Sequence, residues 1–510
     1  MDWERQELGP GLAESWSVAE DQVTWTFKLR AGVRWSDGQP LTADDVLFTW
    51  NDIIYRPELV SPEFDRIVTE LFRPHGTNFA ITKMDGVTVK VVTPEVYAPF
   101  LEYFGGVLIL PQHSLEAAVR SRNLGPALSS HAPPTRIVGS GPFQVKQVVP
   151  EKFTLLERNP EYWVTDKTGR RLPYFEDVRF TVGGGAGTEE LLFLNGKSDL
   201  CEQPRQELYE QFRAGSATNK FLIHDLGAGI EQDFAWFNQN TGTNSAGKPF
   251  VSPDLLKWFA NKKFRQALSG AVDREAIAHD VYRDRAKPTY NFIPSENKRW
   301  NNTNAPRYAF DLARARASLA EIGLDRTNSA GFLSGADGSA VEFKLFCNLG
   351  NPARLHTSER IVQDWKRLGL NVALEPLDFR ELVRRISETF DYDCAIMGLS
   401  GGGIDPASQL HVLKSSADLH QWFPFQKSPA TSWEGRIDHL MDQQMRTLDF
   451  AQRKKMFNEI QMILAEEAPM IQTISQVHYS TARSSLANLR PAVMVPYHLT
   501  WNIEELYFKK

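Results

Sequence analysis

The sequence predicts an α/β protein built around an open sheet, and three observations support this fold class. First, strand-like and helix-like segments alternate between residues 341 and 397. Second, 42% hydrophobic and 24% charged residues are an ordinary globular composition, which excludes disordered, collagen-like and coiled-coil chains. Third, the 510 residues correspond to about three domains, or two large lobes, at roughly 150 residues per domain.

The first half of the chain supplies several of the expected elements. Residues 23–29 alternate polar and apolar side chains, which is the period of a half-buried strand. Thr42-Ala43-Asp44-Asp45 then opens a helix, so we assign Asp44 and Asp45 to the helix start and its dipole and not to a metal site. Further strands are expected at 87–92, 144–149, 153–157 and 178–182.

A glycine-rich run at 183–190 invites comparison with phosphate-binding loops. Gly196-Lys197-Ser198 resembles the end of a Walker A motif, but Leu191 stands where that motif needs its first glycine. Thr188 likewise replaces the third glycine of the dinucleotide-binding motif. We therefore interpret the run as a strand-to-helix turn, whose backbone amides can still meet an anionic ligand group.

The second half carries the clearest α/β pattern. Strands and helices are expected in the order strand 341–347, helix 358–368, strand 371–376, helix 379–386 and strand 393–397. Open α/β sheets bind ligands beyond the carboxyl ends of their strands. The loop 398–406 and the loop after Cys347, which contains Arg354 and His356, are therefore candidate binding edges. Solvated loop residues are the alternative for Arg354 and His356.

Several chemistries find no support in the sequence. HExxH and a complete Walker A motif are absent, and we expect neither an enzyme nor a bound cofactor. Cys201, Cys347 and Cys394 lack zinc-ligand spacing. A Cys347–Cys394 disulfide requires neighbouring strands, and two buried free thiols are the favoured alternative. The 57 basic and 63 acidic residues, with a net charge of −6, argue against binding to nucleic acid or to an anionic membrane.

Motifs spread along the whole chain resemble those of one known family, the family 5 extracellular solute-binding proteins. These are the substrate receptors of peptide- and nickel-type ABC importers. The motifs are Gly11-Leu12-Ala13-Glu14-Ser15-Trp16, Trp25-Thr26-Phe27-Lys28-Leu29-Arg30, Leu41-Thr42-Ala43-Asp44-Asp45-Val46, Gly139-Ser140-Gly141-Pro142-Phe143, Asn159-Pro160-Glu161-Tyr162-Trp163 and Phe264-Arg265-Gln266-Ala267-Leu268. The resemblance implies an ABC permease and its ATPase as partners, a monomer, no cofactor, and a periplasmic or extracytoplasmic location.

The resemblance also implies the architecture. We expect a class II periplasmic-binding-protein fold, with two lobes joined by a hinge and an extra α+β domain on the first lobe. The extra domain is expected at 1–142, lobe one at 143–233 with 480–510 returning to it, and lobe two at 234–479. The ligand, a small molecule or an oligopeptide, is expected in the cleft between the lobes, enclosed by hinge closure.

The N-terminus departs from the family pattern. Family members begin with an export signal, then a strand and a helix, whereas only ten residues precede Gly11 here. Residues 1–7 show neither a basic nor an apolar leader segment, so no signal peptide is expected in the chain as given. We expect a missing N-terminal segment, and membrane association only through the permease or through an anchor in that segment.

The predicted ligand loop departs as well. Peptide-binding members place an aspartate for the ligand ammonium where this chain has Gly402, an aromatic residue where it has Leu399, and in some members an arginine where it has Ile396. Gly401 and Gly402 offer only backbone groups, whereas a buried ammonium needs a charged or multiply hydrogen-bonded acceptor. Asp405 is the candidate substitute anchor.

Aromatic side chains are further ligand candidates. Trp236, Phe237 and Asn238 match a strand whose side chains face the cleft in relatives, and Trp422 falls in the lid region. Core packing is the alternative for each aromatic. The sequence therefore predicts a receptor for a peptide or peptide-like solute. An oligosaccharide or other neutral polar solute is the second hypothesis, and a hydrolase or a signalling receptor domain is the rival from another class.

Overall fold

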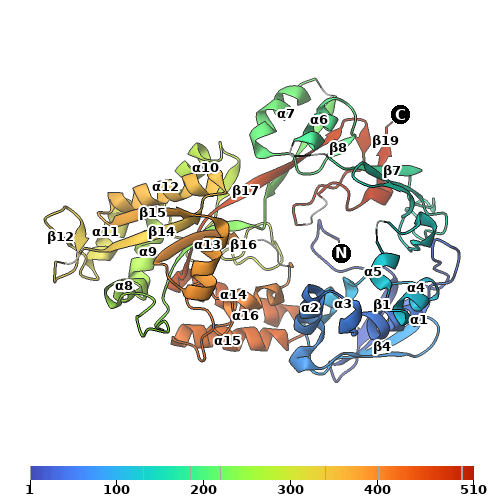
Figure 1. The fold of residues 1–510 in the computed structure, drawn as a ribbon, viewed down its shortest axis with the longest axis horizontal. Coiled ribbons are helices and arrows are strands. Elements are labelled where there is room, and N and C mark those ends of the chain that lie inside the picture. Colours follow the sequence, from blue (N-terminus) through green and yellow to red (C-terminus); the bar gives the residue numbers. More distant parts are fainter. Residues whose placement is uncertain are drawn as a thin grey trace. The chain divides into compact units, whose positions relative to one another are not determined.

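The computed structural model describes residues 2–129, 131–183, 185, 187–218, 220–338, 340–399, 403–494 and 498–509. The chain divides into two units (Figure 1). Unit 1 comprises Met1–Asp225, Arg446–Leu448 and Tyr479–Lys510, and unit 2 comprises Leu226–Met445 and Asp449–His478. Strands β9 (Phe221–Ala228) and β17 (Met470–Arg483) each have residues in both units.

Unit 1 begins with a four-stranded antiparallel sheet in the order β1-β2-β4-β3. The strands are β1 (Ala13–Val18), β2 (Thr24–Leu29), β3 (Ala80–Lys83) and β4 (Thr88–Val92). Thr42 caps α1 (Ala43–Leu47) in a capping box with Asp45, which confirms the predicted helix start. Trp50 and Phe104 stack in the core beneath the sheet, with ring centroids 4.8 Å apart.

A second, three-stranded sheet of unit 1 confirms three more predicted strands. It consists of β5 (Phe143–Val149), β6 (Phe153–Arg158) and β7 (Asp177–Thr181). Helix α6 (Thr188–Leu194) starts directly after Gly187, which has a φ of 89°, so the glycine-rich run leads into a helix as predicted. Gly184 and Ala186 lie outside the described residues. The other elements of unit 1 are α2 (Pro62–Phe72), α3 (Phe100–Gly105), α4 (Gln112–Arg120), α5 (Leu124–Ala127), β8 (Leu200–Cys201), α7 (Tyr209–Ser216), β18 (Leu486–Ala487) and β19 (Tyr507–Phe508).

Unit 2 is organised around a mixed sheet with the strand order β11-β17-β10-β16-β14-β15. Its strands include β10 (Gln232–Phe237), β11 (Ala286–Pro288), β14 (Glu342–Asn348), β15 (Asn371–Leu377) and β16 (Cys394–Leu399). Strand β14 pairs in parallel with β15 and β16, whereas β10 is antiparallel to β16 and β17. The open α/β sheet predicted for 341–397 is confirmed.

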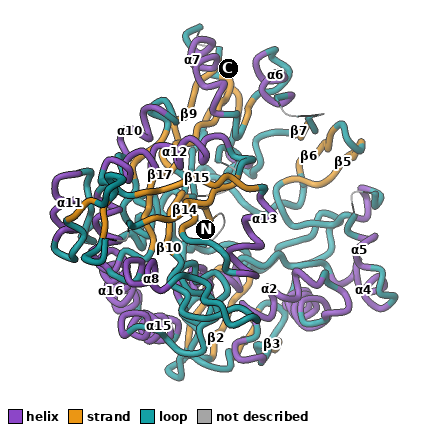
Figure 2. Tube along the Cα trace, turned by 60° about the vertical axis from the view of Figure 1, so that its left-hand side comes forward, coloured by secondary structure: helices purple, strands orange, loops and turns teal. Residues whose placement is uncertain are grey.

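Helices cover the sheet of unit 2 (Figure 2). The helices are α8 (Pro253–Phe259), α9 (Lys262–Gly270), α10 (Arg274–Asp280), α11 (Leu312–Ala320), α12 (Pro352–Arg367), α13 (Phe379–Arg384), α14 (Leu410–Leu413), α15 (Ser432–Met445) and α16 (Phe450–Glu467), and short strands β12 (Arg326–Thr327) and β13 (Leu333–Ser334) form a hairpin. Side chains of α9 and α12, such as Phe264 and Trp365, form the main core of the unit with alternate residues of the strands. Cys201, Cys347 and Cys394 are buried free thiols, as favoured from the sequence.

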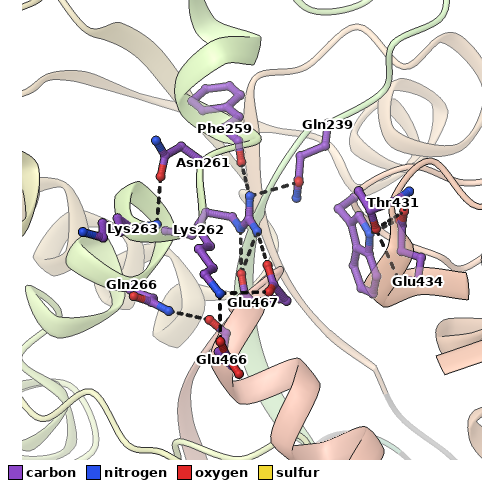
Figure 3. A network of polar contacts seen from close by, with 12 residues as sticks. Gln239, Phe259, Asn261, Lys262, Lys263, Gln266, Thr431, Glu434, Glu466 and Glu467 are labelled. Carbon is purple, nitrogen blue, oxygen red and sulfur yellow. Dashed lines mark hydrogen bonds and ion pairs between the residues drawn. The ribbon is translucent and has the colours of Figure 1, made fainter. Parts of the chain in front are cut away.

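A buried arginine and the neighbouring Lys262 tie α9 to the end of α16, and Figure 3 shows Lys262 beside Glu466 and Glu467. Arg265 is 1% exposed and donates hydrogen bonds to the backbone oxygens of Phe259 and Glu467 and to Oε1 of Gln239. Burial lowers the pKa of its guanidinium to about 10, partly offset by the Glu467 carboxylate. Lys262 reaches the same helix end through ion pairs with Glu466 and Glu467. These contacts fix the helix layer against which the sheet packs.

Candidate functional site

The carboxyl ends of the parallel strands in unit 2 meet at one edge of the sheet. Strands β14 and β16 end there at Asn348 and Leu399. Because β10 is antiparallel to β16, its first residues lie at the same edge, with Asp233 opposite Gly398. Helix α12 begins just beyond β14 and brings Arg354 to this edge. The structure therefore assembles residues that are far apart in the sequence.

Arg354 is held by an ion pair with Asp233. Its Nη2 and Nε lie 2.7 and 3.1 Å from Oδ1 of Asp233, and its Nη1 donates to Oδ1 of Asn348 at 2.9 Å. The two charged side chains are only 14% and 12% exposed. The charge of Arg354 is therefore compensated within the sheet edge, and its contact with an anionic ligand group stays a prediction. His356 lies two residues further along α12 and is exposed.

Gly398 provides the space that the ion pair occupies. A Cβ atom at this position would lie 2.6 Å from Oδ1 of Asp233 and 2.8 Å from Nη2 of Arg354. Both distances are far shorter than van der Waals contact, so a side chain here requires the ion pair to move. Sequence reasoning included Gly398 in the candidate loop 398–406 but missed Asp233, which belongs to no local motif.

Burial raises the pKa of the neighbouring Glu231, and the Asp233 carboxylate raises it further. Arg354 opposes both effects. The edge thus holds two carboxylates and one guanidinium, and its charge is net negative when both carboxylates are ionised. Such an edge is better suited to a neutral or cationic ligand group than to an anionic one.

Asp405, the predicted substitute anchor, is already occupied. Its two carboxylate oxygens bind the two terminal nitrogens of Arg453 at 2.7 and 2.8 Å, and Oδ1 also accepts the backbone N–H of Ala407. Both side chains of the ion pair are 7% exposed. Removing either partner would leave a buried charge without compensation. In this structure Asp405 caps the 3-10 helix after the ligand loop and pairs with Arg453, and its role as a ligand anchor stays a prediction.

The predicted aromatic strand is buried. Phe237 is 0% exposed and belongs to the main core, where it contacts Phe259 and Trp365. Trp236 is also 0% exposed, and its Nε1 donates to the hydroxyl of Tyr392 at 3.1 Å. Asn238 donates from Nδ2 to the backbone oxygen of Tyr392 at 2.8 Å. The structure therefore buries all three side chains, which is the core packing stated as the alternative for the aromatic residues.

Trp422 is fixed by a buried carboxylate. It is 1% exposed, and its Nε1 donates to Oε1 of Glu434 at 2.9 Å. The same carboxylate contacts Nε2 of His420 and Nε2 of Gln426. It also accepts hydrogen bonds from the N–H and the hydroxyl of Thr431, which lies beside Glu434 in Figure 3. Burial by itself raises the pKa of Glu434, but these donors outweigh burial and lower it to about 2. Trp422 therefore belongs to a structural network and not to a ligand surface.

A cavity of about 120 Å³ lies behind the last described residue of β16. Its lining combines the sheet face opposite the main core with α13, the π-helical turn Arg385–Thr389 and the segment 418–424. The lining residues are Phe234, Val383, Ile386, Ser387, Met397, Leu399, Asp418, Leu419, Gln421 and Pro424. Gly401 and Gly402, which follow Leu399 in the predicted ligand loop, lie outside the described residues.

Comparison with known proteins identifies the class of site. Residues 7–421 match the model of the bacterial extracellular solute-binding proteins, family 5. The chain belongs to this family. Family 5 proteins are binding proteins, so the chain is a solute-binding protein and not an enzyme, and the family is extracellular.

Curated relatives of this solute-binding protein match most of the chain. It is 27% identical over 501 residues to a probable ABC transporter-binding protein of Deinococcus radiodurans, covering 92% of this chain and 80% of the relative. It is 24% identical to the dipeptide-binding protein of Escherichia coli, covering 91% of this chain and 80% of the relative. It is also 26% identical to a periplasmic alpha-galactoside-binding protein of Rhizobium meliloti, covering 73% of this chain and 54% of the relative.

Solved structures of similar proteins share the fold. The oligopeptide-binding protein OppA aligns with a TM-score of 0.78 at 21% identity, covering 100% of this chain and 86% of that chain. MelB of Agrobacterium fabrum in complex with stachyose aligns with a TM-score of 0.63 at 22% identity, covering 98% of this chain and 77% of that chain. The two-lobed class II binding-protein fold expected from the motifs is confirmed by this likeness. In the described part of the chain, no helix combines the length and the apolar character that crossing a membrane requires.

Proposed function

We propose that this solute-binding protein captures a peptide or peptide-like solute and delivers it to the permease and ATPase of an ABC importer. The observation that carries the proposal is the family match over residues 7–421. The similarity to the dipeptide-binding protein of Escherichia coli supports a peptide as the solute. In this proposal the protein works as a monomer outside the cytoplasmic membrane. It reaches the membrane through the permease or through an N-terminal anchor.

We place the ligand of this proposal at the carboxyl edge of the unit 2 sheet. The loop 398–406 begins there, and the family places its ligand loop at these positions. Gly401 and Gly402 offer the ligand backbone N–H and C=O groups, since neither has a side chain. The Asp233–Arg354 ion pair holds Gly398 in place at the root of this loop. Ligand recognition is therefore expected to depend on backbone hydrogen bonds and shape more than on one charged anchor.

A second candidate solute is a neutral oligosaccharide. Gly402 stands where peptide-binding members have the aspartate that binds the ammonium group, and Asp405 cannot replace it because Arg453 takes both of its oxygens. The alpha-galactoside-binding relative from Rhizobium meliloti adds to this alternative. Sugars need no ammonium receptor, so the same glycine loop is compatible with them.

A thermal-unfolding screen of the purified chain tests the proposal. The panel contains di- and tripeptides, longer oligopeptides, N-acetylated peptides, raffinose and stachyose. A solute at 100 times its Kd stabilises the protein by about 2.7 kcal/mol, which raises the melting temperature measurably. The proposal expects stabilisation by at least one peptide class, with free and N-acetylated peptides acting alike. Stabilisation by stachyose or raffinose alone would establish the oligosaccharide alternative instead.

A further inference from the structure

We propose that the cavity behind Leu399 is a specificity pocket that receives one medium-sized aliphatic side chain of the ligand. The inference rests on the proposed function, since it treats the ligand as a peptide. Most of the lining is hydrocarbon, from Phe234, Val383, Ile386, Met397, Leu399, Leu419 and Pro424. Apolar walls of this kind select apolar groups, because a polar group placed there would lose its hydrogen bonds to water.

The volume of the cavity limits the size of the guest. A cavity of about 150 Å³ lined by Leu, Ile and Phe accepts benzene. The cavity of about 120 Å³ here is smaller, so it suits a branched group of three or four carbons, such as the side chain of valine, leucine or isoleucine. An indole ring is too large for it. A glycine in the ligand would leave the cavity unfilled.

Close packing of protein interiors makes this cavity informative. Native cores contain few voids larger than one water molecule, and unfilled apolar volume costs stability. The neighbouring Trp236, on the same sheet face, is fully buried at 0% exposure. A void beside such residues therefore indicates space that an external group fills.

The backbone around the cavity is built in an unusual way. The turn Arg385–Thr389, which contributes Ile386 and Ser387, is π-helical and ends at Phe390 with a φ of 52°. Single π turns inside helices occur frequently at functional sites. The opposite wall includes Met397 and Leu399, whose strand leads directly into the predicted ligand loop. The cavity thus adjoins the segment that the family uses for its ligand.

The polar part of the lining sets the charge preference. Asp418 lies at the cavity with its carboxylate 52% exposed, and Oδ1 contacts Nδ1 of His411 at 3.1 Å and the N–H of Leu419 at 3.0 Å. An acidic side chain in the cavity would approach this carboxylate and would also lose its hydration. We therefore expect discrimination against aspartate and glutamate at the ligand position that enters the cavity.

Isothermal titration of the full chain with a tripeptide series tests the pocket. Each series keeps two alanines and varies the third position through glycine, valine, leucine, tryptophan and glutamate, for each of the three positions. One added methylene in a fitted apolar pocket is worth roughly tenfold or more in discrimination. At one position, leucine or valine is expected to bind at least about tenfold more tightly than glycine, tryptophan or glutamate.

Two cavity variants separate a pocket from a general effect on folding. Val383→Phe narrows the cavity and is expected to abolish the preference for leucine over glycine. Leu399→Ala widens it and is expected to shift the preference toward phenylalanine. Val182→Phe, on an exposed residue of unit 1, is the matched control and should change neither. Thermal unfolding of each variant shows whether it folds.

The outcomes distinguish the two proposals. If the wild-type protein binds no peptide of any length, the proposed function fails. If it binds peptides but shows no side-chain preference at any position, the pocket inference fails alone. The inference is also overturned if folded Val383→Phe or Leu399→Ala weakens all peptides by the same factor, because a pocket must change relative affinities.

Discussion

Replacing the buried carboxylate of Glu434 by an amide should destabilise the protein in a pH-dependent way. The carboxylate is surrounded by donors from His420, Trp422, Gln426 and Thr431, which hold its pKa at about 2. One pKa unit corresponds to about 1.36 kcal/mol, so lowering the pKa from 4.5 to about 2 corresponds to about 3 kcal/mol of stability. Glu434→Gln should lose about this amount at pH 7.

The direction of the pH dependence follows from the lowered pKa. The ionised carboxylate contributes its full stabilisation above pH 4.5, and this contribution disappears as the pH falls toward about 2. The difference in unfolding free energy between wild type and Glu434→Gln should therefore shrink from about 3 kcal/mol at pH 7 to about 2 kcal/mol at pH 3.5. Urea unfolding at both pH values measures this difference in unfolding free energy. Hydrogen exchange of the α15 amides at the same pH values is a second measurement.

A matched control uses an exposed glutamate in the same unit. Glu459 of α16 pairs with Arg436 and is 43% exposed, so Glu459→Gln should change stability by less than about 1 kcal/mol at either pH. The reasoning is refuted if Glu434→Gln costs no more than this control. It is also refuted if the cost for Glu434→Gln is the same at pH 7 and pH 3.5.

Three further substitutions test other parts of unit 2. Gly398→Ala should cost about 1–3 kcal/mol in urea unfolding, because its Cβ meets Asp233 and Arg354, whereas Gly350→Ala, with open space around its Cβ, should be neutral. Arg274→Lys should cost about 3 kcal/mol in thermal unfolding, because one ammonium cannot reach all the carbonyls that the 2% exposed guanidinium binds. Unchanged stability of Arg274→Lys would contradict this prediction. Phe237→Leu should lower stability by about 1–3 kcal/mol and leave the ligand Kd unchanged in titration calorimetry. A raised Kd with normal stability would show that the ring contacts the ligand.

The sequence predicted the elements of this protein better than its site. The strands at 371–376 and 393–397 and the capped helix at Thr42 follow from local periodicity and capping chemistry, and the structure has them as β15, β16 and α1. The Asp233–Arg354 pair joins residues 121 positions apart, so no local pattern announces it. The parallel pairing of β14 with β16 brings Asp233 and Arg354 to the same edge of the sheet.

The aromatic strand shows why the burial of single side chains could not be assigned from the sequence. The last four residues of Gln232–Phe237 are all apolar, so no polar alternation tells one sheet face from the other. Phe237 packs into the main core, whereas Phe234 lines the cavity on the opposite face. The ion pair of Asp405 could not be predicted for a different reason, because its partner Arg453 lies 48 residues away on α16.

The π turn Arg385–Thr389 gives the pocket a simple route for evolutionary change. A π turn differs from an α turn by one inserted residue, so deleting a single residue there restores regular helix without touching the sheet. Such a deletion would rotate Ile386 and Ser387 relative to the strands and reshape one wall of the cavity. We therefore expect homologous receptors that import different solutes to differ in length by one residue at this turn.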